Sequence, residues 1–153
     1  MTTVEQKIAE RGLTLPEPAL PIASYVPSRK VGSLIFISGQ LPFRNGELIQ
    51  GLLGTDLSTE EGALAAEACG VMIVSQLKHA LGGDLGRVQC CVKLDGFVAC
   101  TPTFTDHPEV INGASNLMED LFADRGRHAR AAVGCSSLPR GAAVEVAATF
   151  AVD

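Results

Sequence analysis

The apolar residues of this chain recur with a period of about two in some segments and about three and a half in others. Residues 31–38 form a continuous apolar, β-branched run, which predicts a central strand covered on both faces. An Asn45-Gly46 dipeptide soon after this run is typical of a tight hairpin. Before the run, residues 4–11 form a short amphipathic piece within a proline-containing arm. We therefore place an N-terminal arm at residues 1–22 and one domain at residues 23–153.

Two later segments have the periodicity of amphipathic helices. Ser58 and Glu61 form a capping box ahead of the first, and the glycine pair at 82–83 should end it. Asp106 precedes the second, whose apolar stripe runs on until Gly126. The sequence therefore predicts two helices separated by a strand.

That strand, residues 88–100, alternates between apolar and polar positions. The residues that we expect on its covered side are Val88, Cys90, Val92, Leu94 and Val98. The end of the chain, residues 129–152, predicts two more strands that form a hairpin about a turn at 138–141. In this register Gly134 faces Glu145, and the residues that project together from the helix-free side are Arg130, Ala132, Gly134, Glu145 and Ala147.

The predicted order β, β, α, β, α, β, β describes an α+β domain in which two helices cover one face of a mixed sheet. The other face would carry small residues with a few charges, among them Lys93 and Glu145. Such a face is too apolar to stay open to water, and this chain has no further layer to cover it. We therefore expect a partner subunit on it.

Composition narrows the class of protein. Five cysteines, an odd number without a C-x-x-C pair, favour free thiols in a reducing compartment, hence the cytoplasm, and argue against a disulfide framework or a zinc ribbon. The sequence has no metal-binding motif, so we expect no metal site. Twelve basic and seventeen acidic residues give a net charge of -5 with no basic block, so we expect no nucleic-acid partner. No apolar run reaches the roughly 18 residues of a membrane span, and the acidic N-terminus does not resemble a signal peptide.

Arg130 and Glu145 are the residues with the clearest chemical potential. A guanidinium presents a planar fork that matches a carboxylate, and a partly buried carboxylate can deprotonate a water molecule. The pair suits hydrolysis of a small carboxylic acid, but the same residues fit an ordinary ion pair at a subunit interface equally well. A thiol mechanism with Cys135 and His128 is disfavoured, because their spacing of seven puts them on opposite faces of a strand.

Several short stretches of sequence favour a catalytic pair over an ordinary ion pair. They are Tyr25-Val26, Ile37-Ser38-Gly39-Gln40 with Leu41-Pro42, and His128-Ala129-Arg130 through Leu138-Pro139-Arg140-Gly141 to Val144-Glu145-Val146. With these stretches the chain resembles the RidA/YjgF family across most of its length. The resemblance implies a homotrimer of chorismate-mutase-like domains with three clefts between subunits and no cofactor. It also implies that Arg130 binds the substrate carboxylate, Glu145 positions the attacking water, the Ser38-Gly39 backbone contributes hydrogen bonds, and Tyr25 lines the cleft.

The activity implied by the resemblance is hydrolysis of 2-imino and 2-enamino acids to 2-keto acids and ammonia. The chain departs from the family at Ala132, where many members carry a cysteine and use mainly the backbone to bind substrate. The family also has an asparagine near the second helix, for which Asn112 and Asn116 both compete. Two alternatives remain: a non-catalytic trimer that binds small carboxylates, and the ribonuclease or translation-inhibitor activity for which some relatives are named, which the acidic net charge disfavours.

Overall fold

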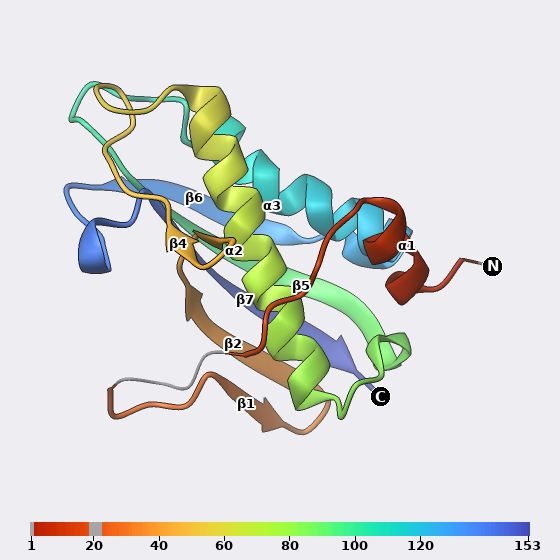
Figure 1. The fold of residues 1–153 in the computed structure, drawn as a ribbon. Helices are drawn as coiled ribbons and strands as arrows, with labels where there is room; N and C mark the ends of the chain where they lie inside the picture. The colour runs from red at the N-terminus through yellow and green to blue at the C-terminus, as the bar shows by residue number, and fades with distance from the viewer. Residues whose placement is uncertain (1, 19–22) are drawn as a thin grey trace.

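The computed structural model, which describes residues 2–18 and 23–153, contains a five-stranded sheet with two long helices across one of its faces (Figure 1). The helices are α1 (Val4–Glu10), α2 (Thr59–Ala80) and α3 (His107–Phe122), with 3-10 turns η1 (Leu85–Arg87), η2 (Ala123–Gly126) and η3 (Pro139–Gly141). The strands are β1 (Ser28–Val31), β2 (Leu34–Gln40), β3 (Phe43–Arg44), β4 (Glu47–Leu48), β5 (Val88–Ala99), β6 (Ala129–Cys135) and β7 (Val144–Val152). The boundary expected at residue 22 falls outside the described residues.

The sheet has the strand order β1-β2-β7-β5-β6. Strands β5 and β6 are parallel, and the other neighbours are antiparallel. The parallel pair is joined by α3, because a chain that must return in the same direction needs a crossover over one face of the sheet. The predicted α+β class, with a mixed sheet and two helices on one face, is confirmed.

The helices begin where their capping residues predict. Ser58 and Glu61 make both hydrogen bonds of a capping box at the start of α2, which ends just before the glycine pair at 82–83. Asp106 occupies the N-cap position of α3 without a capping hydrogen bond, and α3 gives way to η2 at Phe122, before the predicted Gly126. Within the described residues, no helix combines the length and apolar character needed to cross a bilayer.

The strand predicted at residues 31–38 is wrong in its bounds and in its place. A turn at Gly32 and Ser33 separates β1 from β2, and Gly32 has a φ of +59° that a glycine adopts without strain. The centre of the sheet is β7, whereas β2 lies between β7 and the edge strand β1. Only alternate residues of β2 are buried, and Phe36 remains 45% exposed. The continuous apolar run therefore reflects a second face that this chain itself does not cover.

The predicted Asn45-Gly46 hairpin is confirmed, whereas the alternation predicted for β5 is wrong at its start. The Asn45-Gly46 hairpin forms between β3 and β4, with both residues at positive φ. In β5 the expected alternation fails near the start, where two register shifts exchange the faces. Cys91 is buried there instead of Cys90, and Val92 is exposed. A bulge inserts one extra residue, so a strict alternation places the residues beside it wrongly.

The hairpin predicted for residues 129–152 does not form. Strand β5 lies between β6 and β7, and it pairs with both along most of their lengths. Gly134 is therefore beside Val98 and not beside Glu145. Alternation along a strand determines which of its residues share a face, but it does not determine which strand lies next to it.

The observed strand pairing places Arg130 and Glu145 on different faces of the sheet. Arg130 is the neighbour of Leu94, which is fully buried beneath the helices, so Arg130, Ala132 and Gly134 lie on the helix side. Glu145 is the neighbour of Phe97 and lies on the helix-free side, as predicted. The prediction that Arg130 and Glu145 share one face is therefore wrong.

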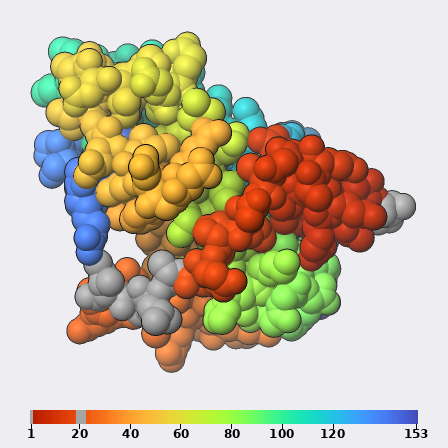
Figure 2. Space-filling model, in the orientation of Figure 1, coloured from red at the N-terminus to blue at the C-terminus, as the bar shows by residue number. Residues whose placement is uncertain are grey.

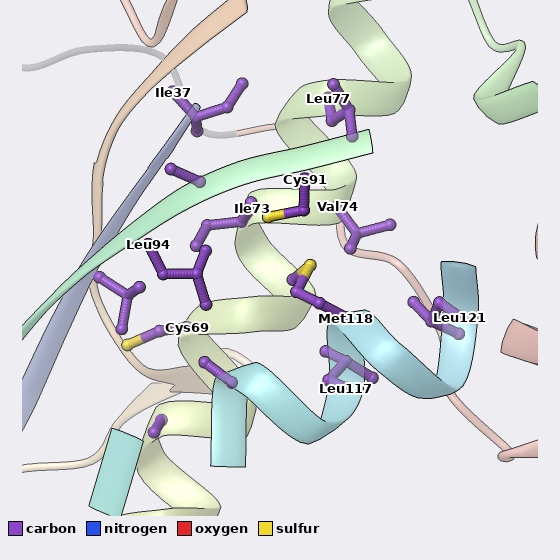
Figure 3. Packing of buried hydrophobic residues seen from close by; sticks show 14 of the residues in the cluster. Ile37, Cys69, Ile73, Val74, Leu77, Cys91, Leu94, Leu117, Met118 and Leu121 are labelled. Atoms are coloured by element: carbon purple, nitrogen blue, oxygen red, sulfur yellow. The ribbon is translucent and has the colours of Figure 1, made fainter. Parts of the chain in front are cut away.

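The hydrophobic core lies between the sheet and the two long helices. The buried side chains of the central strand are those that alternation predicts, namely Val144, Val146, Ala148, Phe150 and Val152. Figure 3 shows the helices and β5 meeting in this cluster through Cys69, Ile73, Val74, Leu77, Leu117, Met118, Leu121, Cys91 and Leu94. Helix α1 adds Val4 and Ile8 to the same core.

The backbones of helices α2 and α3 lie close together at Gly113. A Cβ atom at this position would lie 1.9 Å from the carbonyl oxygen of Ala63. We expect Gly113→Ala to lower the free energy of unfolding by about 3 kcal/mol or more, because two backbones would have to separate. Urea denaturation of the variant and the wild type measures this free energy. The control is Asn116→Ala on the exposed side of α3, which should change stability by about 0.5 kcal/mol or less; equal stabilities of the two variants would contradict the close approach.

Candidate functional site

Arg130 lies on the edge strand β6, where its side chain reaches the first turns of α3. Its Nη1 donates hydrogen bonds to Asn112 Oδ1 at 2.8 Å and to Ser115 Oγ at 3.1 Å. Its Nη2 donates to the carbonyl oxygen of Pro108 at 3.2 Å. The guanidinium is therefore held by three acceptors on one helix. Of the two asparagines that competed at the sequence level, Asn112 is the one beside Arg130.

All three acceptors of Arg130 are neutral. A guanidinium has five N–H donors. Three of them have acceptors among the described residues, which leaves the Nε–H and one Nη2–H. In the part of the chain that the structure describes, no carboxylate forms an ion pair with Arg130. A cation that is oriented but not neutralised is suited to bind an anion such as a carboxylate.

The floor beside Arg130 is made of small residues. Ala132 packs against the core, and Gly134 lies under His107 and Cys100, whose side chains would be 2.5 Å and 2.8 Å from a Cβ at that position. An adjoining cavity of about 570 Å³ has the lining Leu52, Cys100, Thr101, Pro102, Phe104, His107, Gly134, Cys135 and Ser136. The absence of a side chain at Gly134 therefore leaves room for the His107 and Cys100 side chains at the edge of this cavity.

Glu145 lies on the opposite face of the sheet, at the end of β2. A bulge in β2 places Ser38 and Gly39 together opposite one residue of β7. A Cβ at position 39 would lie 2.9 Å from Glu145 Cδ, so only a glycine leaves room for the carboxylate. Glu145 is partly buried, and this burial raises the pKa of its carboxyl group above the ordinary value.

Ser38 lies in the same bulge and is hydrogen-bonded to the segment that carries Tyr25. Ser38 Oγ donates a hydrogen bond to the carbonyl oxygen of Val26 at 2.7 Å, which ties β2 to the segment before β1. Gln40 Nε2 donates to the Ser38 carbonyl at 2.9 Å. Tyr25 is 50% exposed in the single chain, so its ring is free to contact a ligand or a second copy.

The candidate residues therefore form two half-sites, one around Arg130 and one around Glu145. The two residues are two strands and three positions apart, which corresponds to about 10 Å in each direction within the sheet. Because they also project from opposite faces, one chain does not bring them to the same small molecule. Each half-site needs a complement from elsewhere.

Sequence reasoning missed the helix side of the Arg130 half-site. Ser115 is one of the buried residues of α3, and His128 precedes β6, yet the two side chains are in hydrogen-bond contact at 2.8 Å. Contacts between a helix and a strand leave no periodic signal in the sequence, so spacing could not have indicated them. The resemblance did point to an asparagine on this helix, which was the one available signal.

The remaining features of the described surface do not join the two half-sites. A second cavity of about 530 Å³ lies on α2 between the N-terminal segment and the β3–β4 hairpin, which flank the helix in Figure 2. It contains none of the predicted site residues. Among the described residues, no group of three or more His, Cys, Asp or Glu side chains is arranged to hold a metal ion.

Known proteins resemble this chain over almost its whole length. A model of the family described as YjgF/chorismate mutase-like, which carries a provisional endoribonuclease label, matches residues 5–150. A Trypanosoma cruzi protein named TCP17 is 46% identical over 145 residues, which cover 94% of this chain and 90% of that protein.

Solved structures show the same fold. Atu1372 from Agrobacterium tumefaciens, a protein of unknown function, has a TM-score of 0.91 and 45% identity, covering 99% of this chain and 94% of that one. A Shewanella oneidensis protein, also described provisionally as an endoribonuclease, has a TM-score of 0.94 and 32% identity, covering 98% and 99%. This is therefore an α+β protein of the chorismate mutase-like class. More narrowly, the chain belongs to the RidA/YjgF family, as the sequence resemblance predicts.

We expect Glu145→Gln to be more stable than the wild type at neutral pH. Burial raises the pKa of Glu145, so the folded state holds the proton more tightly than the unfolded state does. The cost of ionising this buried group is absent below the ordinary carboxyl pKa of about 4.3 and grows as the pH rises through the folded value. Urea denaturation of both proteins from acid to neutral pH should show that the difference in their free energies of unfolding increases with rising pH. A difference that does not change with pH would contradict the raised pKa.

Proposed function

We propose that this protein is a hydrolytic deaminase that converts 2-imino and 2-enamino acids to 2-keto acids and ammonia. The observation that carries the proposal is the guanidinium of Arg130, which α3 orients through three neutral acceptors while no carboxylate of the described chain neutralises it. Such a group favours a ligand with a carboxylate. The raised pKa of Glu145 supports the hydrolytic step, since a carboxyl titrating closer to neutral pH is a better general base.

In the proposed mechanism, Arg130 binds the substrate carboxylate and Glu145 takes a proton from water as the water oxygen bonds to the imine carbon. Glu145 passes this proton to the imine nitrogen, which gives a tetrahedral carbinolamine. Glu145 then takes the proton of the carbinolamine hydroxyl and delivers it to the amine, the C–N bond breaks, ammonia leaves, and the carbonyl of the 2-keto acid forms. Proton transfers and water suffice for these steps, so we propose that no cofactor is needed.

The complete site is proposed to form between copies of the chain, as a homotrimer. Within one chain the two half-sites face in opposite directions, and the helix-free face of the sheet keeps apolar side chains exposed. Phe36, Val92 and Val133 are 45%, 38% and 48% exposed there, which favours burial against another copy. In the assembled cleft, the Ser38-Gly39 backbone, Tyr25 and the backbone of Ala132 would line the substrate.

The proposed setting is the cytoplasm. All five cysteines are free, and burial raises the pKa of Cys91 to about 12 and that of Cys69 well above its ordinary value. Thiols of this kind are inert in a reducing compartment. The proposed partner is a small 2-imino or 2-keto acid, and the net charge of -5 argues against nucleic acid.

Wild-type protein should accelerate the decay of 2-iminopropanoate generated by an amino-acid oxidase, followed by its absorbance. We expect Glu145→Gln to lower kcat by about 100-fold or more, because the general base is lost. We expect Arg130→Ala to raise KM by at least about tenfold, because a charged hydrogen-bonded pair is lost. Arg87→Ala, which removes a guanidinium paired with Asp153 at 3.1 Å outside both half-sites, is the control for a lost cation.

Two other results would each favour a different function. If wild type and Glu145→Gln both bind pyruvate and neither turns over any imine, the protein is a carboxylate-binding trimer without catalysis. If folded wild type degrades RNA in a salt-dependent manner and ignores imines, the endoribonuclease description of the relatives applies. The experiment distinguishes these cases because each has its own substrate.

Mixing of two impaired variants tests whether the site is shared between copies. Arg130→Ala and Glu145→Gln, each impaired alone at low substrate concentration, should regain part of the wild-type activity when they are co-expressed in one oligomer, because some clefts then receive both native residues. Co-expression of either variant with itself is the matched control. If both residues acted within one chain, no cleft of the mixed oligomer would be complete, and activity would stay at the level of the single variants.

A further inference from the structure

Two side chains outside the proposed reaction centre connect to Arg130 through hydrogen bonds. Ser115 Oγ, which accepts from Arg130 Nη1, lies 2.8 Å from Nε2 of His128. His128 Nδ1 lies 2.6 Å from the carbonyl oxygen of Gly126. Ser115 is only 8% exposed and lies on α3, so the contact joins the helix to the segment that leads into β6.

The direction of each hydrogen bond follows from the groups involved. A carbonyl oxygen only accepts, so His128 Nδ1 carries a hydrogen and donates it to Gly126. In a neutral imidazole, Nε2 is then an acceptor and receives the hydroxyl hydrogen of Ser115. The lone pairs of Ser115 Oγ are thereby left to accept from Arg130 Nη1. Each of the three donors in this series therefore has an acceptor of its own.

We propose that Ser115 and His128 are positioning residues that hold the Arg130 guanidinium ready for a carboxylate. The inference rests on the proposed function, because it assumes that Arg130 binds the substrate carboxylate. A long side chain on an edge strand has many rotamers, and fixing it before the ligand arrives reduces the entropy lost on binding.

Neither residue carries a negative charge, and this is part of the role. A carboxylate in place of Ser115 would also orient the guanidinium, but it would neutralise the charge that attracts the substrate. His128 instead fixes the hydroxyl direction through its Nε2, and the hydroxyl fixes Nη1. The edge of the guanidinium with the Nε–H stays available for the ligand.

The tautomer of His128 is the first test, and it does not depend on activity. In histidine-labelled protein, nitrogen NMR should show neutral His128 with its proton on Nδ1. The chain has only three histidines, so His79→Gln and His128→Gln assign the signals. A proton on Nε2 alone would reverse the polarity of the Ser115 contact and overturn the proposal.

Substitutions test the effect on binding, with pyruvate as the probe and 2-iminopropanoate as the substrate. Ser115→Ala and His128→Asn should raise the Kd for pyruvate and the KM by about tenfold, with a smaller change in kcat. His128→Gln places an acceptor near the position of Nε2, whereas Asn reaches only the position of Nδ1. The Gln variant should therefore stay within about threefold of wild type. His79→Gln, at the exposed end of α2, is the matched control.

The outcomes separate the two proposals. If wild type binds pyruvate and both His128 variants match it, the positioning role fails while the proposed function stands. Equal losses in the Asn and Gln variants, or losses that follow the melting temperature, would also overturn the role of Nε2. If wild type neither binds pyruvate nor consumes the imine, the proposed function fails, and the assumption behind the positioning role fails with it.

Discussion

The position of β5 between β6 and β7 is the constraint on which the rest of this structure depends. Because each residue of β6 shares the face of its neighbour on β5, Arg130 follows the buried Leu94 to the helix side. Pairing with β7 places Glu145 beside Phe97 on the other side. The cation and the acid are thus separated by the sheet itself, and no side-chain rotation within β7 could bring the carboxylate through it.

This separation gives each charged group an environment suited to a different task. Arg130 at the sheet edge is surrounded by neutral acceptors from α3, which orient it and leave its charge intact. Glu145 lies against the backbone of Gly39, where burial disfavours its ionised form. Had the two formed an ion pair, each would have weakened the other as a binding or proton-transfer group.

The open face of the sheet relates this separation to assembly. In the proposed homotrimer, a second copy would cover the apolar residues of this face and bring its own side chains toward Glu145. Hydrophobic burial and completion of the site would then be the same event.

The sequence by itself determined the elements and faces that depend on local pattern: both long helices with their caps, the buried alternation of β7, the face of Glu145, and the family. Tertiary structure alone decided which strands are neighbours, where bulges exchange faces, as at Cys91, and which of Asn112 and Asn116 meets Arg130. The physical reason is that a period of two or 3.6 residues is set by the backbone of one segment. Strand pairing and helix–strand contacts such as Asn112 with Arg130 instead depend on residues that are not neighbours in the sequence, and the folded structure decides which of them meet.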